Sequence, residues 1–149
     1  MNTSVSQARA VDVLLDKYAE SHQNAVNEYI HFVAVPVIMW TVLGLIWSIH
    51  PYLAVAAAVV SLAYYFTLSV SFAVGMSIMA AAMLWILYML PPSLVLPVAI
   101  GAFVIAWIFQ FIGHKIEGKK PSFFDDLRFL LIGPLFVLSF LYRRLNIAY

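Results

Sequence analysis

The fold is decided by the stretch from Tyr29 to His114, which contains no Asp, Glu, Lys or Arg and reads YIHFVAVPVIMWTVLGLIWSIHPYLAVAAAVVSLAYYFTLSVSFAVGMSIMAAAMLWILYMLPPSLVLPVAIGAFVIAWIFQFIGH. Every charged residue lies outside this stretch, in residues 9–28 or 115–144. The whole chain is 64% hydrophobic and 10% charged, with a mean hydropathy of +0.96. A soluble domain must present polar groups to water. So long an uncharged stretch therefore indicates helices buried in a bilayer.

Turn-forming residues divide the uncharged stretch into four apolar segments. His50 and Pro51 mark the first turn, and Pro91 and Pro92 end the third segment. The run between them is nearly continuous, so we place a tight turn near Gly75 from the total length. At about 1.5 Å per residue, the second segment is long enough to cross a hydrocarbon core of about 30 Å. The predicted spans are residues 32–49, 52–72, 74–90 and 94–112.

Shorter helices are predicted on both sides of the spans. Residues 5–20, within the polar segment 1–28, place apolar side chains at helical spacing opposite charged ones, which predicts an amphipathic helix on the membrane surface or against the bundle. Residues 127–142 are short for a crossing and form a re-entrant helix or a fifth span; we favour the re-entrant form. The predicted fold class is all-α: a single membrane-embedded domain of residues 1–149, a polytopic transmembrane helical bundle with these two additional helices.

An even number of crossings has a topological consequence. It places the polar segment before residue 32 and the polar loop 113–126 at the same membrane face. The basic residues after the fourth span lie at this face, and the connections near residues 50, 74 and 92 have none, so the positive-inside rule predicts that it is cytoplasmic. Both termini are expected on the cytoplasmic face of a bacterial inner membrane or an endoplasmic reticulum membrane. The basic residues in question are Lys115, Lys119, Lys120 and Arg128.

Composition excludes several functional classes. A net charge of +1 provides no electrostatic footprint for nucleic acid. The absence of cysteine removes disulfides, thiolate metal sites and cysteine nucleophiles. The sequence has no Gly-rich phosphate loop, GxSxG elbow or HExxH helix, which disfavours kinases, serine hydrolases and zincins.

Three of the four histidines, His22, His31 and His114, flank the uncharged stretch at its two ends. The crossing count brings these ends to one face, and convergence of this kind is what a metal site needs. Imidazole and carboxylate ligands suit iron, zinc or manganese, and without thiolates such a site is of the oxygen-activating or hydrolytic type. Taken singly, His22 is expected to be a solvated surface side chain, and His50 an interfacial or turn histidine.

Spacing arranges the neighbouring polar residues into two stripes. Gln110, His114 and Glu117 lie at i, i+4 and i+7 on one helical face, and so do the residues of a second stripe. His22 and His31 would point in nearly opposite directions on one straight helix. Both can bind one metal only if a helix breaks or starts between them. The second stripe consists of Asn24, Asn27 and His31.

Three segments carry a resemblance to a known family. They are SHQNAVNEYIHFVAVP at 21–36, QFIGHKIEGKKPSFFDD at 110–126 and LIGPLF at 131–136. The chain resembles the Mpo-type membrane 2-hydroxy fatty acid dioxygenases, which act in fatty acid alpha-oxidation during sphingoid-base breakdown. The resemblance implies an Fe(II)-dependent enzyme that uses dioxygen to shorten a 2-hydroxy fatty acid by one carbon and releases carbon dioxide.

The resemblance also implies roles for individual residues. His22, His31 and His114 match the family's histidines and are expected to bind the iron. Glu117 is expected to be a further catalytic ligand or the acceptor that orients His114. The remaining polar residues of the two stripes are expected to support the ligands or orient the substrate: Asn24, Asn27 and Gln110.

Two rival functions remain at this stage. A non-enzymatic membrane scaffold or assembly protein would use the polar face to bind a partner. A metal or proton transporter would need ionisable groups through the depth of the membrane, and the segment between His50 and His114 has no acidic, basic or histidine residue. A desaturase-type enzyme with two irons needs about eight histidines by family analogy, which is more than the chain's 4. The partners expected are therefore the fatty acid, dioxygen and membrane lipid, and the sequence gives no oligomeric state.

Overall fold

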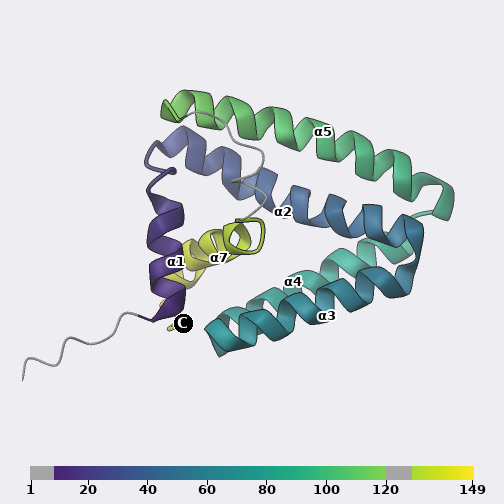
Figure 1. Cartoon of the computed structure of the whole chain (residues 1–149), viewed down its shortest axis with the longest axis horizontal. Coiled ribbons are helices and arrows are strands. Elements are labelled where there is room, and N and C mark those ends of the chain that lie inside the picture. Colours follow the sequence, from purple (N-terminus) through teal and green to yellow (C-terminus); the bar gives the residue numbers. More distant parts are fainter. Residues whose placement is uncertain (1–8, 120–128) are drawn as a thin grey trace, which may run out of the picture.

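The computed structural model describes residues 9–119 and 129–149. Every regular element in these ranges is an α-helix, which confirms the predicted all-α class (Figure 1). The described helices are α1 (Ala10–Ala19), α2 (Ala25–Ile49), α3 (Pro51–Leu68), α4 (Val70–Met89), α5 (Pro92–Glu117) and α7 (Ile132–Arg144).

Helices α2 to α5 are long and apolar enough to cross a membrane, so the prediction of four spans is confirmed within the described ranges. They run in alternating directions, which brings the start of α2 and the end of α5 to one end of the bundle (Figure 1). In an apolar stretch of 18 residues from each of these helices, only 17–33% of the residues are buried inside the protein. Most side chains of the spans therefore face outward, as contact with lipid requires.

Two of the spans extend further into the polar segments than predicted. Helix α2 begins at Ala25 instead of residue 32, because the side chain of Asn24 accepts a hydrogen bond from the amide of Val26 at 2.9 Å and caps the helix. Helix α5 continues to Glu117 and ends where Gly118 adopts a left-handed φ of 76°. Part of the predicted loop 113–126 is therefore helical. Lys120 and Arg128, two of the basic residues that predict the cytoplasmic face, lie outside the described residues.

The turn between α3 and α4 lies at Ser69, earlier than the predicted turn near Gly75. Ser69 has an extended backbone (φ −165°, ψ 129°), and its hydroxyl accepts a hydrogen bond from the amide of Phe72 at 3.3 Å. Gly75 lies inside α4, where a side chain would overlap the hydroxyl of Tyr142 in α7. Glycine at this position therefore permits the close approach of α7 to α4 and does not form a turn.

Helices α1 and α7 pack together against the spans at the end where α2 begins (Figure 1). Val11, Leu15 and Tyr18 of α1 are buried, as the predicted amphipathic helix requires, although its predicted start at residue 5 lies outside the described residues. Helix α7 has 13 residues. It is therefore about 20 Å long, shorter than a hydrocarbon core of about 30 Å. The core that joins α1, α3, α4 and α7 includes Val11, Leu15, Tyr18, Tyr65, Phe72, Met76, Leu135, Phe136, Leu138 and Tyr142.

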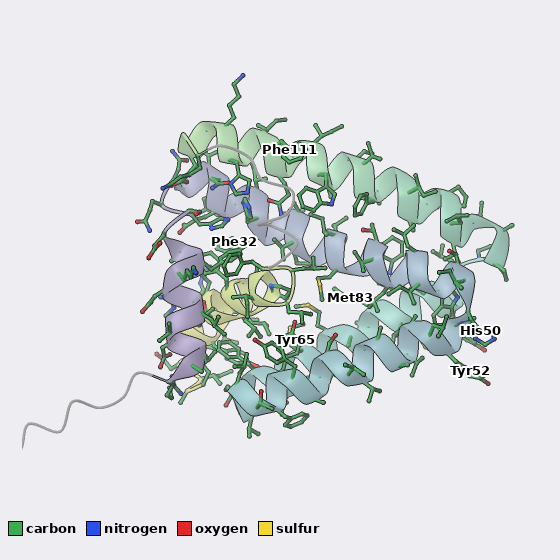
Figure 2. The ribbon with its side chains drawn as sticks, viewed as in Figure 1. Phe32, His50, Tyr52, Tyr65, Met83 and Phe111 are labelled. Carbon is green, nitrogen blue, oxygen red and sulfur yellow. The ribbon has the colours of Figure 1, made fainter. Side chains whose placement is uncertain are left out.

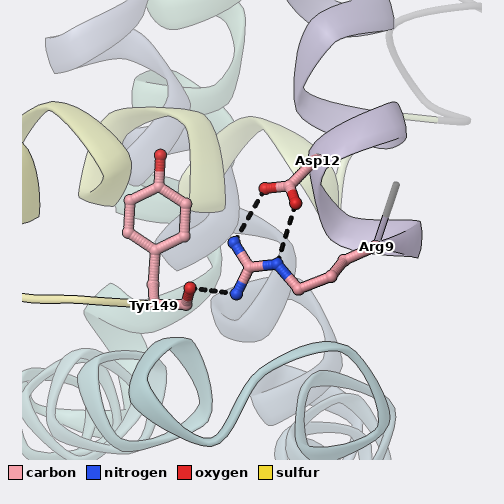
Figure 3. A network of polar contacts seen from close by, with 3 residues as sticks. All are labelled: Arg9, Asp12 and Tyr149. Atoms are coloured by element: carbon pink, nitrogen blue, oxygen red, sulfur yellow. Dashed lines mark hydrogen bonds and ion pairs between the residues drawn. The ribbon is translucent and has the colours of Figure 1, made fainter. Parts of the chain in front are cut away.

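A polar network joins the start of α1 to Tyr149. The guanidinium of Arg9 donates two hydrogen bonds to the carboxylate of Asp12, at 2.8 and 2.9 Å, and another to the backbone oxygen of Tyr149 (Figure 3). The ring of Tyr149 in turn lies 4.4 Å from the ring of Phe72 in α4, centroid to centroid. These contacts link α1 to α4 through the chain segment that follows α7.

Candidate metal centre

His22, His31 and His114 converge at the end of the bundle where α2 begins. His22 follows α1, His31 lies in the second turn of α2, and His114 lies in the last turn of α5. All three side chains are buried, and one nitrogen of each lies within 4.8 Å of one nitrogen of each of the others. His22 is thus an interior residue, contrary to the expectation for this histidine taken alone.

The turn between α1 and α2 allows His22 and His31 to meet. Helix α1 ends at Ala19 and α2 starts at Ala25, so His22 lies in the connection between them. The two rings are 4.1 Å apart between centroids and nearly perpendicular. The condition derived from the nine-residue spacing, that a helix starts between the two histidines, is therefore met.

Backbone carbonyls orient two of the three rings. Nδ1 of His22 lies 2.7 Å from the carbonyl oxygen of Tyr18, and Nδ1 of His31 lies 2.8 Å from that of Asn27. A carbonyl oxygen can only accept a hydrogen bond, so each Nδ1 carries the proton. In the neutral rings the lone pair is then on Nε2, the arrangement in which metal-binding histidines are usually held. The ring of Tyr18 also stacks on that of His22, 4.2 Å away and 4° from parallel.

Glu117 is not a member of the histidine cluster found among the described residues. Its carboxylate instead contacts the start of α2. One carboxylate oxygen accepts from the amide of Gln23 at 2.8 Å. The other accepts from the amide of Asn24 at 2.8 Å and from the side chain of Asn27 at 3.1 Å. The predicted catalytic residue Glu117 therefore fixes the end of α5 to the segment between His22 and His31.

Asn27 is fully buried between the two polar stripes. Its amide nitrogen donates to the backbone oxygen of Ser21 at 3.2 Å as well as to Glu117. Its amide oxygen lies against Gly113, where a side chain would overlap it. The role of Gly113 was not predicted, and its only signal in the sequence was a glycine directly before His114, after the bulky run WIFQFI. Asn24, by contrast, serves as the cap of α2.

Gln110 lies one turn before His114 and is 4% exposed. Its amide oxygen is buried and has no hydrogen-bond partner among the described residues. His50 lies at the other end of the bundle, where it is exposed and caps α3 by accepting from the amide of Tyr52 at 3.2 Å. Figure 2 shows His50 and Tyr52 together at this turn, as expected for a turn histidine.

The chemistry of the cluster suits a transition metal. Three imidazoles, two of which keep a lone pair on Nε2, form a nitrogen-rich site that could hold a metal ion. Three protein ligands leave further coordination positions for substrate, the property that distinguishes catalytic sites from structural ones. The ring of His22 lies against Tyr18 of α1 and 5.7 Å from Phe136 of α7, and His31 and His114 belong to α2 and α5.

The fold and the histidine cluster together define a helical membrane protein with a buried site, at one end of the bundle, that could bind a metal. Residues 8–145 match the family described as 2-hydroxy-palmitic acid dioxygenase Mpo1-like, and the chain belongs to this family. It is 26% identical over 133 residues to the 2-hydroxy-palmitic acid dioxygenase MPO1 of Saccharomyces cerevisiae, an alignment that covers 85% of this chain and 76% of the yeast protein. No solved structure matches the chain.

Proposed function

We propose that the chain is an Fe(II)-dependent dioxygenase that shortens 2-hydroxy fatty acids by one carbon in lipid catabolism. The observation that carries this proposal is the convergence of three buried histidines from separate segments at one end of an apolar bundle. The name of the yeast relative supports the substrate class. The bundle supports it as well, because a long acyl chain partitions into the same apolar phase as the spans.

The proposed reaction balances without an external reductant. The bond between C1 and C2 of the acid breaks, C1 leaves as carbon dioxide, and C2 is oxidised from an alcohol to a carboxylic acid. Dioxygen takes up all the electrons released and supplies oxygen to the products, with water as the remaining product. The site therefore has no need of a nicotinamide, a flavin or a reductase partner.

His22, His31 and His114 would hold the iron. When bound, Fe(II) supplies a redox-active Lewis acid for dioxygen activation, whereas zinc has no accessible redox change. The carbonyls of Tyr18 and Asn27 hold the rings of His22 and His31 in the tautomer that a metal requires. Glu117 then acts as a positioning residue through its three hydrogen bonds to the start of α2.

Burial of the cluster lets the chain exclude water while the fatty acid enters from the lipid. We place the cluster near the cytoplasmic face, with both termini on that side, because no described basic residue lies at the two turns of the opposite end. The described basic residues belong to the segments outside those turns: Arg9, Lys17, Lys115, Lys119, Arg143 and Arg144. The carboxylate head of the substrate would then approach from the membrane surface and its tail would remain between helices or in lipid.

Metal removal tests the proposal directly. The purified chain is treated with EDTA, reloaded with Fe(II) or Zn(II), and incubated with 2-hydroxypalmitic acid and dioxygen. We expect chelation to abolish substrate loss, Fe(II) to restore it with a product one carbon shorter, and Zn(II) to bind without restoring it. Activity that survives complete removal of iron would overturn the proposal.

A pair of histidine variants provides the matched control. His114→Ala removes one member of the cluster, whereas His50→Ala removes a histidine at the opposite end of the bundle. We expect His114→Ala to lose bound iron and turnover and to remain folded, and His50→Ala to keep both. A membrane scaffold would still bind its partner after either change, so a His114→Ala variant that keeps its biological function without iron would favour that rival.

A further inference from the structure

Gln110 is a buried polar side chain that the proposed metal site does not use. It lies on the same face of α5 as His114, one turn deeper in the span. Its amide oxygen makes no hydrogen bond with any described residue. A buried amide without a partner destabilises a fold by about 1–3 kcal/mol. Such an arrangement calls for a partner that the polypeptide does not supply.

The side chain of Gln110 lines a small cavity beside the histidine cluster. The cavity has a volume of about 20 Å³, which is room for one water-sized group. Tyr18, whose ring stacks on His22, forms another part of its wall and connects it to the cluster. The lining residues are Tyr18, Val35, Ile38, Trp107, Gln110, Phe129, Leu130 and Gly133.

The size and chemistry of this cavity restrict its occupant. A space for one heavy atom cannot hold a carboxylate or an acyl chain, but it can hold a hydroxyl group. An amide oxygen requires a hydrogen-bond donor. At neutral pH the carboxylate of a 2-hydroxy fatty acid is ionised and can only accept, so the 2-hydroxyl is the one donor that this substrate has.

We propose that Gln110 is the specificity residue of the site: its amide oxygen, in the cavity next to the histidine cluster, accepts a hydrogen bond from the 2-hydroxyl of the fatty acid. This inference rests on the proposed function, since it concerns that substrate. A site built to bind a hydroxyl discriminates against the analogue that lacks it, because the buried acceptor is then left without a partner. Non-hydroxylated fatty acids of equal length are thus bound less tightly.

Equilibrium binding to the full chain tests the inference. The dissociation constants of 2-hydroxypalmitic acid and palmitic acid are measured by competition with a fluorescent fatty acid, with Zn(II) bound so that no turnover occurs. We expect the unaltered chain to prefer the hydroxylated acid by roughly ten- to hundred-fold. Gln110→Leu should reduce this preference to near unity and leave palmitic acid binding unchanged. If Gln110→Leu does not fold, Gln110→Met, which retains the length of the side chain, is used in its place.

Thr41→Val is the matched control. Thr41 is also buried in a span, donates its hydroxyl to the backbone oxygen of Ile38 at 2.8 Å, and does not line the cavity. Its replacement should leave the preference unchanged.

Four results would overturn the inference. In the first, Gln110→Leu keeps the full preference, as expected if the cavity holds a structural water only; in the second, it weakens the binding of both acids equally, as expected of a structural role. An unaltered chain that consumes 2-hydroxypalmitic acid but binds both acids equally would contradict the inference and leave the proposed function standing. An unaltered chain that binds neither acid would overturn both.

Discussion

At the residue scale, the tautomers of two of the clustered histidines are set by backbone atoms that belong to helices. The carbonyl of Tyr18 lies in the last turn of α1, where it accepts from the amide of Ser21 at 3.3 Å and also from Nδ1 of His22 at 2.7 Å. The carbonyl of Asn27 does the same for His31 from within α2. Because these acceptors are backbone atoms, no side-chain substitution removes them, and the tautomers depend on helix geometry alone.

Glu117 provides the sharpest test at this scale, because two roles were predicted for it. Glu117→Gln keeps the shape but places an NH2 group where one carboxylate oxygen now accepts, either from Gln23 or from both Asn24 and Asn27. We expect the variant to be about 1–3 kcal/mol less stable and its metal affinity to fall about ten- to hundred-fold without being lost. Thermal unfolding and metal titration measure the two effects. A complete loss of metal, equal to that in His114→Ala, would instead show that Glu117 is a ligand.

At the element scale, much of the site follows from where helices begin and end. The spacing of His22 and His31 required a helix start between them, and the parity of the spans brought His114 to the same end; both inferences needed only the sequence. The position of the α3–α4 turn could not be inferred, because no charge or proline marks Ser69 in that apolar run. The roles of Gly75 and Gly113 depend on contacts with α7 and Asn27, which local patterns do not encode.

The packing of α2 against α5 at Gly113 yields a prediction with a control on the same helix. Gly113→Ala puts a methyl group into the amide oxygen of Asn27, so α2 and α5 must separate or Asn27 must release Glu117. We expect a loss of about 1–3 kcal/mol in stability and weaker metal binding. The free energy of unfolding in detergent and a metal titration measure these effects.

Gly101→Ala is the matched control for Gly113→Ala, because no atom lies within 4 Å of the added carbon. In a helix interior this replacement should raise stability by about 0.5–1 kcal/mol, since alanine is the better helix former. If the two alanine variants have the same stability, the contact between Gly113 and Asn27 does not hold the helices together.

At the scale of the whole molecule, the spans and the two short helices have different structural roles. The alternating spans bring the start of α2 and the end of α5 together, and α1 and α7 pack against each other at this end of the bundle (Figure 1). The network of Arg9, Asp12 and Tyr149 fastens α1 in this position. A site assembled in this way requires an even number of crossings, because an odd number would separate His31 from His114 by the thickness of the bilayer.

Single-cysteine labelling tests this topology, and the absence of native cysteine means that each introduced thiol reacts alone. Glu20→Cys and Lys119→Cys alter exposed positions at the end near the histidines, and Tyr52→Cys alters a side chain that is 79% exposed at the opposite end. In sealed vesicles of known orientation, a membrane-impermeant maleimide should label Glu20→Cys and Lys119→Cys from the cytoplasmic side and Tyr52→Cys from the other. Labelling of Glu20→Cys and Lys119→Cys from opposite sides would mean an odd number of crossings, and His31 and His114 could not then share a metal.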